Sequence, residues 1–313
     1  MQKRKFGYCC INLSLQEGKK AERITTNRGM TSKTFKERGI SYASQLAKEN
    51  TCDLRRIILW NNLNGIKMYR MSSDMFPWCS EYEIKDLPDF SSIKKNLELA
   101  GNEAKSGGQR ITFHPSHFNV LASLNPDVVK KAIKEIDQHA EIMDLMGLER
   151  TRQYPINIHV NTTQPSKEEA ANRFCENFSL LSEAARSRLV VEIDDKTSQF
   201  NVADLKMMIY DKVGIPITFD FLHNKCNPAE GIDERSALEI CLNTWPSGIV
   251  PLTHYSESKK LFEDFSSKLL AHSDWIHEKI ETYGFDFDIE LEVKMKEKAL
   301  LDYHQKLESI LHD

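Results

Sequence analysis

The feature that most constrains this fold is an alternation, repeated along the whole chain, between short β-branched or aromatic runs and longer amphipathic stretches. Helical periodicity is clear around residues 33–64, 126–147 and 166–188, and the second of these has Pro126 near its start and Gly147 as a C-terminal cap. The eight runs predicted to be strands are residues 6–10, 66–72, 110–114, 156–160, 189–195, 216–221, 250–256 and 287–294.

Alternating strands and helices imply parallel strands joined by right-handed crossovers, and eight such units close naturally into a barrel. We therefore predict an α/β protein with a single (β/α)8 TIM barrel, whose active site lies at the C-terminal ends of the strands. An open doubly wound sheet is the alternative, but it would normally carry a Gly-rich phosphate turn after strand one. That turn here reads CCINLSL. Because barrels of this type run as one domain, residues 1–313 are expected to form a single domain.

Composition restricts the cellular setting more than the partner. The net charge of -4 does not indicate a nucleic-acid binder, so a DNA-binding role would need basic side chains gathered on one face. The seven cysteines form no C-x-x-C pair, which favours a reducing compartment over a disulfide framework or a thiolate zinc site. The sequence shows no signal peptide and no apolar run long enough to span a bilayer, so a cytoplasmic protein is expected.

Nitrogen and carboxylate side chains stand at the ends of six successive predicted strands and in the loop after the seventh. A single histidine at a strand end is more often structural than a ligand. Glu192 and Glu292, however, interrupt strands that are otherwise apolar or alternating, and a buried carboxylate is costly unless it is paired or metal-bound. The candidate metal ligands are His114, His159, Glu192, Asp220, His223, His254, His272 and Glu292.

This ligand set contains no cysteine and is divided between imidazole and carboxylate, which suits Mn, Zn or Fe. A bridging carboxylate would hold two ions about 3.5–4 Å apart, an arrangement that serves in-line displacement at phosphorus. A metal-dependent sugar isomerase or epimerase can use the same residue types in a similar barrel. The cluster alone therefore does not choose between these functions.

Ten motifs in a fixed order give the chain a family resemblance that covers nearly its whole length. They are GYCCINLSL, TTNR, YRMSSDMFPW, ITFHP, INIHV, VEIDDK, FDFLHNKCNP, HYSES, AHSDWI and ELEVKMKEKA. With these motifs the chain resembles the UV damage endonucleases, relatives of the endonuclease IV type of abasic-site nucleases.

The resemblance implies a site for up to three divalent ions, Mn first with Zn, Co or Mg as alternatives, bound by the eight candidate ligands. It implies hydrolysis of the phosphodiester immediately 5′ to a lesion in duplex DNA. Glu192 would be the bridging carboxylate and would act in catalysis with Asp220 and Glu292. Lys294, two residues after Glu292 and so expected on the same strand face, would meet the scissile phosphate. Tyr8 and Asn12 match the family's contacts to the damaged strand.

The chain departs from the family's pattern in two places. Leu252 stands where the family often has a lysine close to the metals, so one metal is expected to be held less tightly. His117 and Phe118 stand where the family commonly has a glutamine and an aromatic that pry into the duplex, so Phe118 is expected to supply the stacking plane unless it packs under its own loop. Asp74, at a position that varies in the family, is a further candidate site residue.

The expected partner is damaged double-stranded DNA, with no membrane, no obligate protein partner and a monomeric state. Three other functions remain open at this point. They are an abasic-site endonuclease of the same barrel type, a metal-dependent sugar isomerase or epimerase, and a catalytically silent module that binds DNA damage.

Overall fold

Eight parallel strands form a closed barrel in sequence order, from β1 to β8 and back to β1. The computed structural model describes residues 4–19 and 22–312, with side chains described as far as residue 307. This closed eight-stranded barrel confirms the predicted (β/α)8 fold. The strands are β1 (Phe6–Cys9), β2 (Met68–Met71), β3 (Arg110–Phe113), β4 (Ile156–Ile158), β5 (Leu189–Glu192), β6 (Ile217–Asp220), β7 (Leu252–Tyr255) and β8 (Asp288–Leu291).

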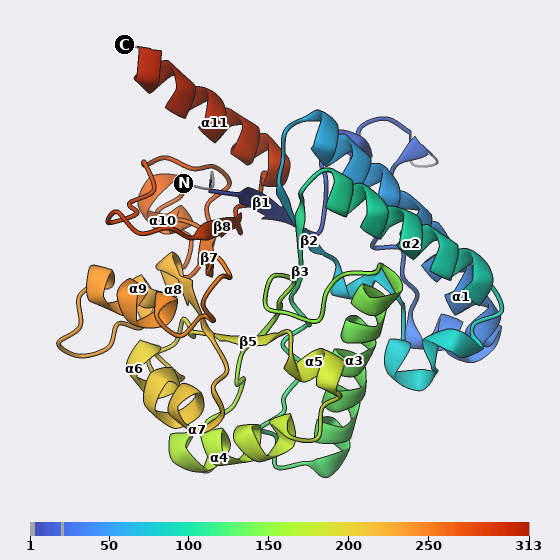
Figure 1. Ribbon diagram of the computed structural model, residues 1–313, viewed down its shortest axis with the longest axis horizontal. Helices are drawn as coiled ribbons and strands as arrows, with labels where there is room; N and C mark the ends of the chain where they lie inside the picture. Colours follow the sequence, from blue (N-terminus) through green and yellow to red (C-terminus); the bar gives the residue numbers. More distant parts are fainter. Residues whose placement is uncertain (1–3, 20–21, 313) are drawn as a thin grey trace.

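Helices surround the strands, with α1 and α2 side by side on one flank and α11 reaching away from the barrel (Figure 1). The α-helices are α1 (Ser32–Leu63), α2 (Phe90–Ser106), α3 (Pro126–Leu145), α4 (Lys167–Phe178), α5 (Glu183–Arg186), α6 (Val202–Leu205), α7 (Asp211–Val213), α8 (Phe221–Cys226), α9 (Glu234–Leu242), α10 (Lys259–Phe262) and α11 (Lys296–His312). Shorter helical turns are η1 (Ser14–Gln16), η3 (Ser73–Met75), η4 (Cys79–Glu81), η5 (Ile84–Asp86) and η6 (Lys206–Tyr210). Among the described residues, no helix combines the length and the apolar character needed to cross a membrane.

The predicted elements match the observed ones except at some of their ends and within one predicted helix. The helix predicted over 166–188 is two helices, because α4 ends at Phe178 and Ser182 caps a new helix by accepting a hydrogen bond from the amide of Ala185. The strand predicted over 189–195 ends at Glu192, since the amide of Asp194 already bonds to the carbonyl of Phe200 in the following loop. A helix-capping hydrogen bond at Ser182 and a loop hydrogen bond at Asp194 thus set the limits of these two elements.

The lower end of the barrel is filled by side chains that contact one another across its interior. Leu252 on β7 packs with Met68 on β2, Val190 on β5 and Trp245, although these strands are not neighbours in the sheet. Because side chains alternate along a strand, Leu252 shares the inward face with His254 and lies one layer below it. The leucine therefore forms part of an apolar floor beneath the barrel mouth.

Helix packing around the barrel is close enough to require glycine at one contact. Gly101 on α2 lies against α3's end, where an added Cβ atom would stand 1.8 Å from the carbonyl oxygen of Met146. Any larger residue at 101 would force the two helices apart.

Candidate active site

The candidate ligands converge at the C-terminal mouth of the barrel, as their positions on the strands predict. Glu192, Asp220 and His254 lie within β5, β6 and β7, while His114 and His159 follow β3 and β4 directly. The pairing of Asp220 with His254 across β6 and β7 sets these two side chains at the same height. Strand register alone therefore places most of the cluster.

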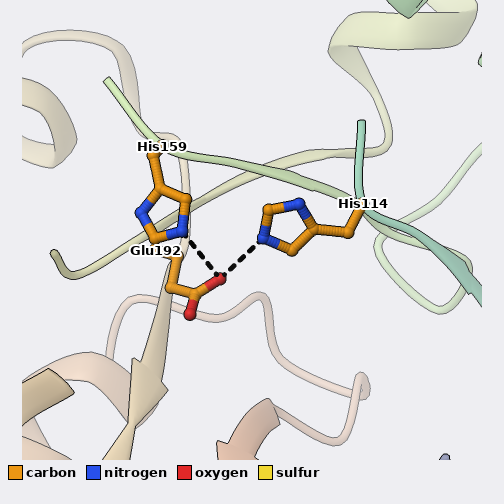
Figure 2. A group of neighbouring side chains, drawn as sticks. All are labelled: His114, His159 and Glu192. Carbon is orange, nitrogen blue, oxygen red and sulfur yellow. Dashed lines mark hydrogen bonds and ion pairs between the residues drawn. The ribbon is translucent and has the colours of Figure 1, made fainter. Parts of the chain in front are cut away.

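Glu192 occupies the centre of the cluster, with its side chain only 1% exposed. Its Oε2 atom lies 3.1 Å from Nε2 of His114, 3.5 Å from Nε2 of His159 and 3.1 Å from Nδ1 of His254. Its Oε1 atom lies 3.2 Å from Nδ1 of His223. Figure 2 shows His114 and His159 pointing toward the carboxylate from two neighbouring strands. One carboxylate thus faces imidazoles from four separate elements of the barrel.

The nitrogen, sulfur and oxygen donors fall into four groups whose ligand atoms lie within 4.8 Å of one another. Glu192 is the residue shared by three of these groups, which is the position that a bridging ligand requires. The three groups that contain Glu192 are His114–His159–Glu192, Glu192–Asp220–His223 and Glu192–His254–Glu292. The fourth combines Cys9, Glu290 and Glu292.

His272 lies at the edge of this cluster and belongs to none of the four groups. Its Nδ1 atom is 3.8 Å from Oε2 of Glu292, and its ring stands edge-on to that of His223. The structure therefore brings His272 to the mouth beside Glu292, farther from Glu192 than the other histidines.

Polar contacts behind the histidines orient two of the rings, by a hydrogen bond at His114 and an ion-pair contact at His159. Nδ1 of His114 is 3.0 Å from the carbonyl oxygen of Pro115, and Nδ1 of His159 is 3.0 Å from Oδ1 of Asp194. These contacts occupy the outer nitrogens and leave both Nε2 atoms facing Glu192, which is the arrangement seen behind metal-bound imidazoles. Asp194, which holds His159 in this way, is a site residue that the sequence analysis missed. The only signal for it is its place in the VEIDD run after β5.

The ion pairs that Arg70 makes with two glutamates at the same mouth were also missed. Nη1 of Arg70, at the inward side of β2, lies 3.0 Å from Oε1 of Glu290 and 2.5 Å from Oε1 of Glu292. Glu290 is fully buried and accepts a further hydrogen bond from Thr112. Arg70 thus compensates one carboxylate within β8, that of Glu290, and one just after it, that of Glu292, whose orientation it fixes. The alternation within ELE marks Glu290 as inward-facing, but nothing in the sequence pairs it with Arg70.

The pKa values within the cluster express this mutual charge stabilisation. Burial alone would raise the pKa of Glu192, but the imidazoles of His254 and His159 hold it well below its usual range. Burial would lower the pKa of His254, but Glu192 and Glu292 raise it to about 9. Burial raises the pKa of Asp220, which has fewer compensating partners. Protons and divalent cations therefore compete for the same nitrogen atoms.

Several donor atoms in the cluster are buried without a well-aligned hydrogen bond. They include Oε1 of Glu192, Oδ2 of Asp220 and both ring nitrogens of His254. Leaving such atoms without a partner costs about 1–3 kcal/mol each, and more for charged groups. Inward-pointing nitrogen and oxygen atoms of this kind are the ligands that Mn or Zn takes, so the residues present fit a divalent metal centre.

The cluster opens into a cavity of about 530 Å³ at the barrel mouth. Besides His114, His159, His223 and Glu292, its wall includes Arg70, His117 and Lys196. A second cavity of about 490 Å³ adjoins it and is lined in part by Phe118, Trp78 and Asp74. The cluster of candidate ligands is thus reached through an open, polar mouth with an aromatic rim.

Of the predicted DNA contacts, His117 and Phe118 are exposed at this rim. Phe118 is 75% exposed, so the alternative that it packs under its own loop is wrong. Its ring lies 4.1 Å, centroid to centroid, from that of His117.

The predicted role of Tyr8 and Asn12 as contacts to the damaged strand is contradicted by their burial. Tyr8 is 0% exposed and Asn12 is 1% exposed. The Asn12 side chain donates to the hydroxyl of Tyr8, which in turn donates to Asn61 on α1. These polar atoms are used inside the protein, where they tie the end of β1 to α1.

Three further expectations need correction or qualification. Lys294 is exposed, but β8 ends at Leu291, so the strand-face argument that aligned Lys294 with Glu292 does not hold. Asp74 lies in η3 on the wall of the second cavity and in none of the donor groups. Leu252 lies in the apolar floor below His254, where it offers no ligand atom.

The closed barrel with imidazoles and carboxylates at its C-terminal mouth defines the broad class: a (β/α)8 protein of the kind that carries its reacting groups at the strand ends. Within that class, the chain belongs to the UV-endonuclease UvdE family, whose model matches residues 4–312.

Similar proteins agree with this assignment. A UV-damage endonuclease of Schizosaccharomyces pombe is 31% identical over 97% of this chain, which spans about half (51%) of the length of that relative. A UV DNA damage endonuclease of Bacillus thuringiensis is 31% identical, with 98% of this chain and 95% of that protein covered. The crystal structure of SacUVDE superposes with a TM-score of 0.82 at 29% identity, covering 98% of this chain and 99% of that one.

More distant structures share the fold alone. They include endonuclease IV from Thermus thermophilus, at 15% identity and a TM-score of 0.51 over 82% of this chain and 94% of that one. An E. coli 3-keto-D-glucoside 4-epimerase reaches 12% identity and a TM-score of 0.55 over the same shares. Because a nuclease and an epimerase both superpose, barrel geometry does not decide the reaction.

Proposed function

We propose that this protein is a DNA repair endonuclease that recognises UV photoproducts in duplex DNA and hydrolyses the phosphodiester immediately 5′ to the lesion. The observation that carries the proposal is the position of Glu192 in three donor groups at an open barrel mouth, within a chain of the UvdE family. A centre with a shared carboxylate suits in-line displacement at phosphorus.

The metal centre in this proposal is formed by the eight candidate ligands, with Glu192 as the bridge. Divalent ions, Mn²⁺ first, would lower the pKa of a bound water and neutralise charge on the attacked phosphate. His114 and His159 present Nε2 to the centre because their Nδ1 atoms are held from behind. Arg70 fixes the carboxylate of Glu292 at 2.5 Å.

Substrate recognition in this proposal uses the rim of the mouth. The exposed ring of Phe118 stacks on or wedges beside a base at the lesion, with His117 as an adjacent hydrogen-bonding group. The exposed side chains of Lys196 and Lys294 lie at or near the mouth and would meet phosphates. The overall charge of -4 makes such local positive groups necessary.

A plasmid-nicking assay tests the proposal. Supercoiled plasmid, with and without UV irradiation, is incubated with the protein and Mn²⁺, and an end-labelled duplex with one defined photoproduct locates the cut. Nicks confined to irradiated DNA, at the phosphodiester 5′ to the lesion, are expected. Equal nicking of both plasmids, or cleavage of an abasic-site duplex alone, would contradict the proposed specificity.

A further inference from the structure

The loop after β7 carries an unusual concentration of exposed apolar side chains. We call residues 258–272 the β7 loop. Within nine of its residues, Leu261, Phe262, Phe265 and Leu269 are 59%, 37%, 84% and 46% exposed. Exposed apolar side chains gathered on one loop favour a binding site, although the Phe262 ring also stacks on His277.

The tip of the β7 loop is a structured turn that presents Phe265 outward. The amide of Ser267 donates to the carbonyl of Asp264 at 3.0 Å, which makes Phe265 the second residue of a hydrogen-bonded turn. The carboxylate of Asp264 also accepts hydrogen bonds from the amide and hydroxyl of Ser266, at 3.0 and 2.6 Å. Because the polar groups of the turn are satisfied locally, the exposed ring of Phe265 is held at the tip.

The base of the β7 loop is joined to the candidate active site. Ser258 and His272 form a β-bridge that closes the loop, and the amide of Lys259 donates to the carbonyl of Ala271 at 2.7 Å. His272 in turn lies 3.8 Å from the carboxylate of Glu292. The loop that carries the apolar tip is therefore anchored at its base beside the candidate ligands His272 and Glu292.

Two lysines of the β7 loop have no ion-pair partner among the described residues, whereas its two carboxylates are held by hydrogen bonds within or beside the loop. The carboxylate of Glu263 accepts hydrogen bonds from two backbone amides and a histidine ring, and that of Asp264 caps the turn. Lys259 is held by a neighbouring aspartate at 2.9 Å. Lys260 and Lys268 are exposed and form no ion pair with any residue that the structure describes. Two free ammonium groups beside an aromatic tip are complementary to a nucleic-acid backbone and its bases.

The topology sets this loop opposite the rim residue Phe118. In a closed barrel of eight strands, β3 and β7 are four strands apart, so the loops that follow them leave on opposite sides of the mouth. Phe118 follows β3 and Phe265 follows β7, and both rings are largely exposed. The cluster around Glu192 lies between the two sides.

We propose that the β7 loop is a second duplex-contacting element, with Phe265 packed against the bases on the side of the lesion opposite Phe118. Lys260 and Lys268 contact phosphates of the same duplex. This inference rests on the proposed endonuclease function and deepens it. Two aromatic contacts on either side of the mouth would hold the duplex distorted across the reacting phosphate, as apolar wedges do in other kinked complexes.

The test compares Phe265→Ala with wild type and with Leu63→Ala. Leu63 is 86% exposed at the end of α1, which leads into β2 and so lies at the opposite end of the barrel. Affinity is measured for a duplex with one photoproduct and 2-aminopurine beside it, using Ca²⁺ to prevent cleavage. We expect Phe265→Ala to weaken binding about tenfold and to reduce the 2-aminopurine signal, whereas Phe265→Trp retains both and Leu63→Ala changes neither. Replacing Lys260 and Lys268 by Gln should lower the salt slope of binding by about two.

The outcomes separate this inference from the function beneath it. If wild-type protein neither binds nor nicks damaged DNA, the proposed function itself fails. If wild type is active but Phe265→Ala binds the lesion duplex with unchanged affinity and signal, the β7 loop is not a DNA contact. Sedimentation of both proteins adds a third arm, because a dimer that Phe265→Ala converts to a monomer would assign the patch to self-association instead.

Discussion

Replacement of Glu192 by Gln is the sharpest perturbation of the candidate centre, because it keeps the side chain's shape and removes its charge. The carboxylate lies 3.1–3.5 Å from ring nitrogens of four histidines and also accepts a hydrogen bond from Asn157. A glutamine retains one oxygen, but its amide group presents hydrogens to the remaining imidazoles. It therefore cannot bridge two cations.

The expected loss follows from the number of donor groups that share this residue. Removing a single preorganised electrostatic group typically lowers kcat by about 10²–10³, or about 3–4 kcal/mol. Because Glu192 belongs to three donor groups, we expect Glu192→Gln to lose at least about 10³-fold in nicking rate with saturating Mn²⁺. Metal content after gel filtration should fall with it, while circular dichroism shows the fold retained.

A matched control separates loss of the centre from loss of a buried charge. Asp288→Asn also removes a buried carboxylate, but at the lower end of the barrel, where Asp288 pairs with Arg110 at 2.9 Å. Leaving a buried arginine unpaired costs about 3–5 kcal/mol of stability, so this variant should melt at a lower temperature. Its nicking rate well below that temperature should remain close to wild type. Nicking by Glu192→Gln at the wild-type rate would refute the bridging role and require a new assignment of ligands.

The remaining predictions concern the rim, metal retention and pH. Phe118→Ala should weaken lesion binding about tenfold with little change in melting temperature, because its ring is 75% exposed. An equal loss of binding to damaged and undamaged duplexes would show that Phe118 does not recognise the lesion. Since Leu252 offers only hydrocarbon below His254, one metal should be lost on exhaustive dialysis and activity should depend on added Mn²⁺. Elemental analysis that finds three ions after dialysis, with full activity in the absence of added Mn²⁺, would contradict this. The pKa of His254 is raised from 6.5 to about 9. Protonation of His254 therefore stabilises the metal-free fold, fully so below about pH 6.5, and this stabilisation is lost as the pH rises through about 9. Metal binding needs the neutral imidazole, so the rise in melting temperature produced by Mn²⁺ should grow between about pH 6.5 and 8.5; an increment independent of pH would show that His254 is not a ligand.

The positions of the candidate ligands could be predicted because strand periodicity is a local property. His114, Glu192, Asp220 and His254 each end or follow a short apolar run, and the ends of parallel strands in a barrel share one mouth. Once eight such runs were recognised, their convergence needed no knowledge of side-chain contacts.

The sequence could not reveal which polar groups are used inside the protein. Tyr8 stands at a strand end much like the ligands, yet its hydroxyl bonds to Asn61 and Asn12 and is buried. The pairing of Arg70 with Glu290 joins strands far apart in the chain. Such partners are chosen by packing between elements, which local periodicity does not encode.

By itself, the sequence determined the alternation of strands and helices, the closure into a barrel and the identity of the side chains at its mouth, because these depend on residue spacing along single elements. Only the tertiary structure decided that Lys294 lies beyond the end of β8, that Leu252 packs into the floor, and that Phe118 and Phe265 project from opposite loops. Those features depend on hydrogen bonds and contacts between distant segments, such as the bridge from Ser258 to His272. Loop conformation follows from such non-local contacts, and the surface that would meet a substrate is made of loops.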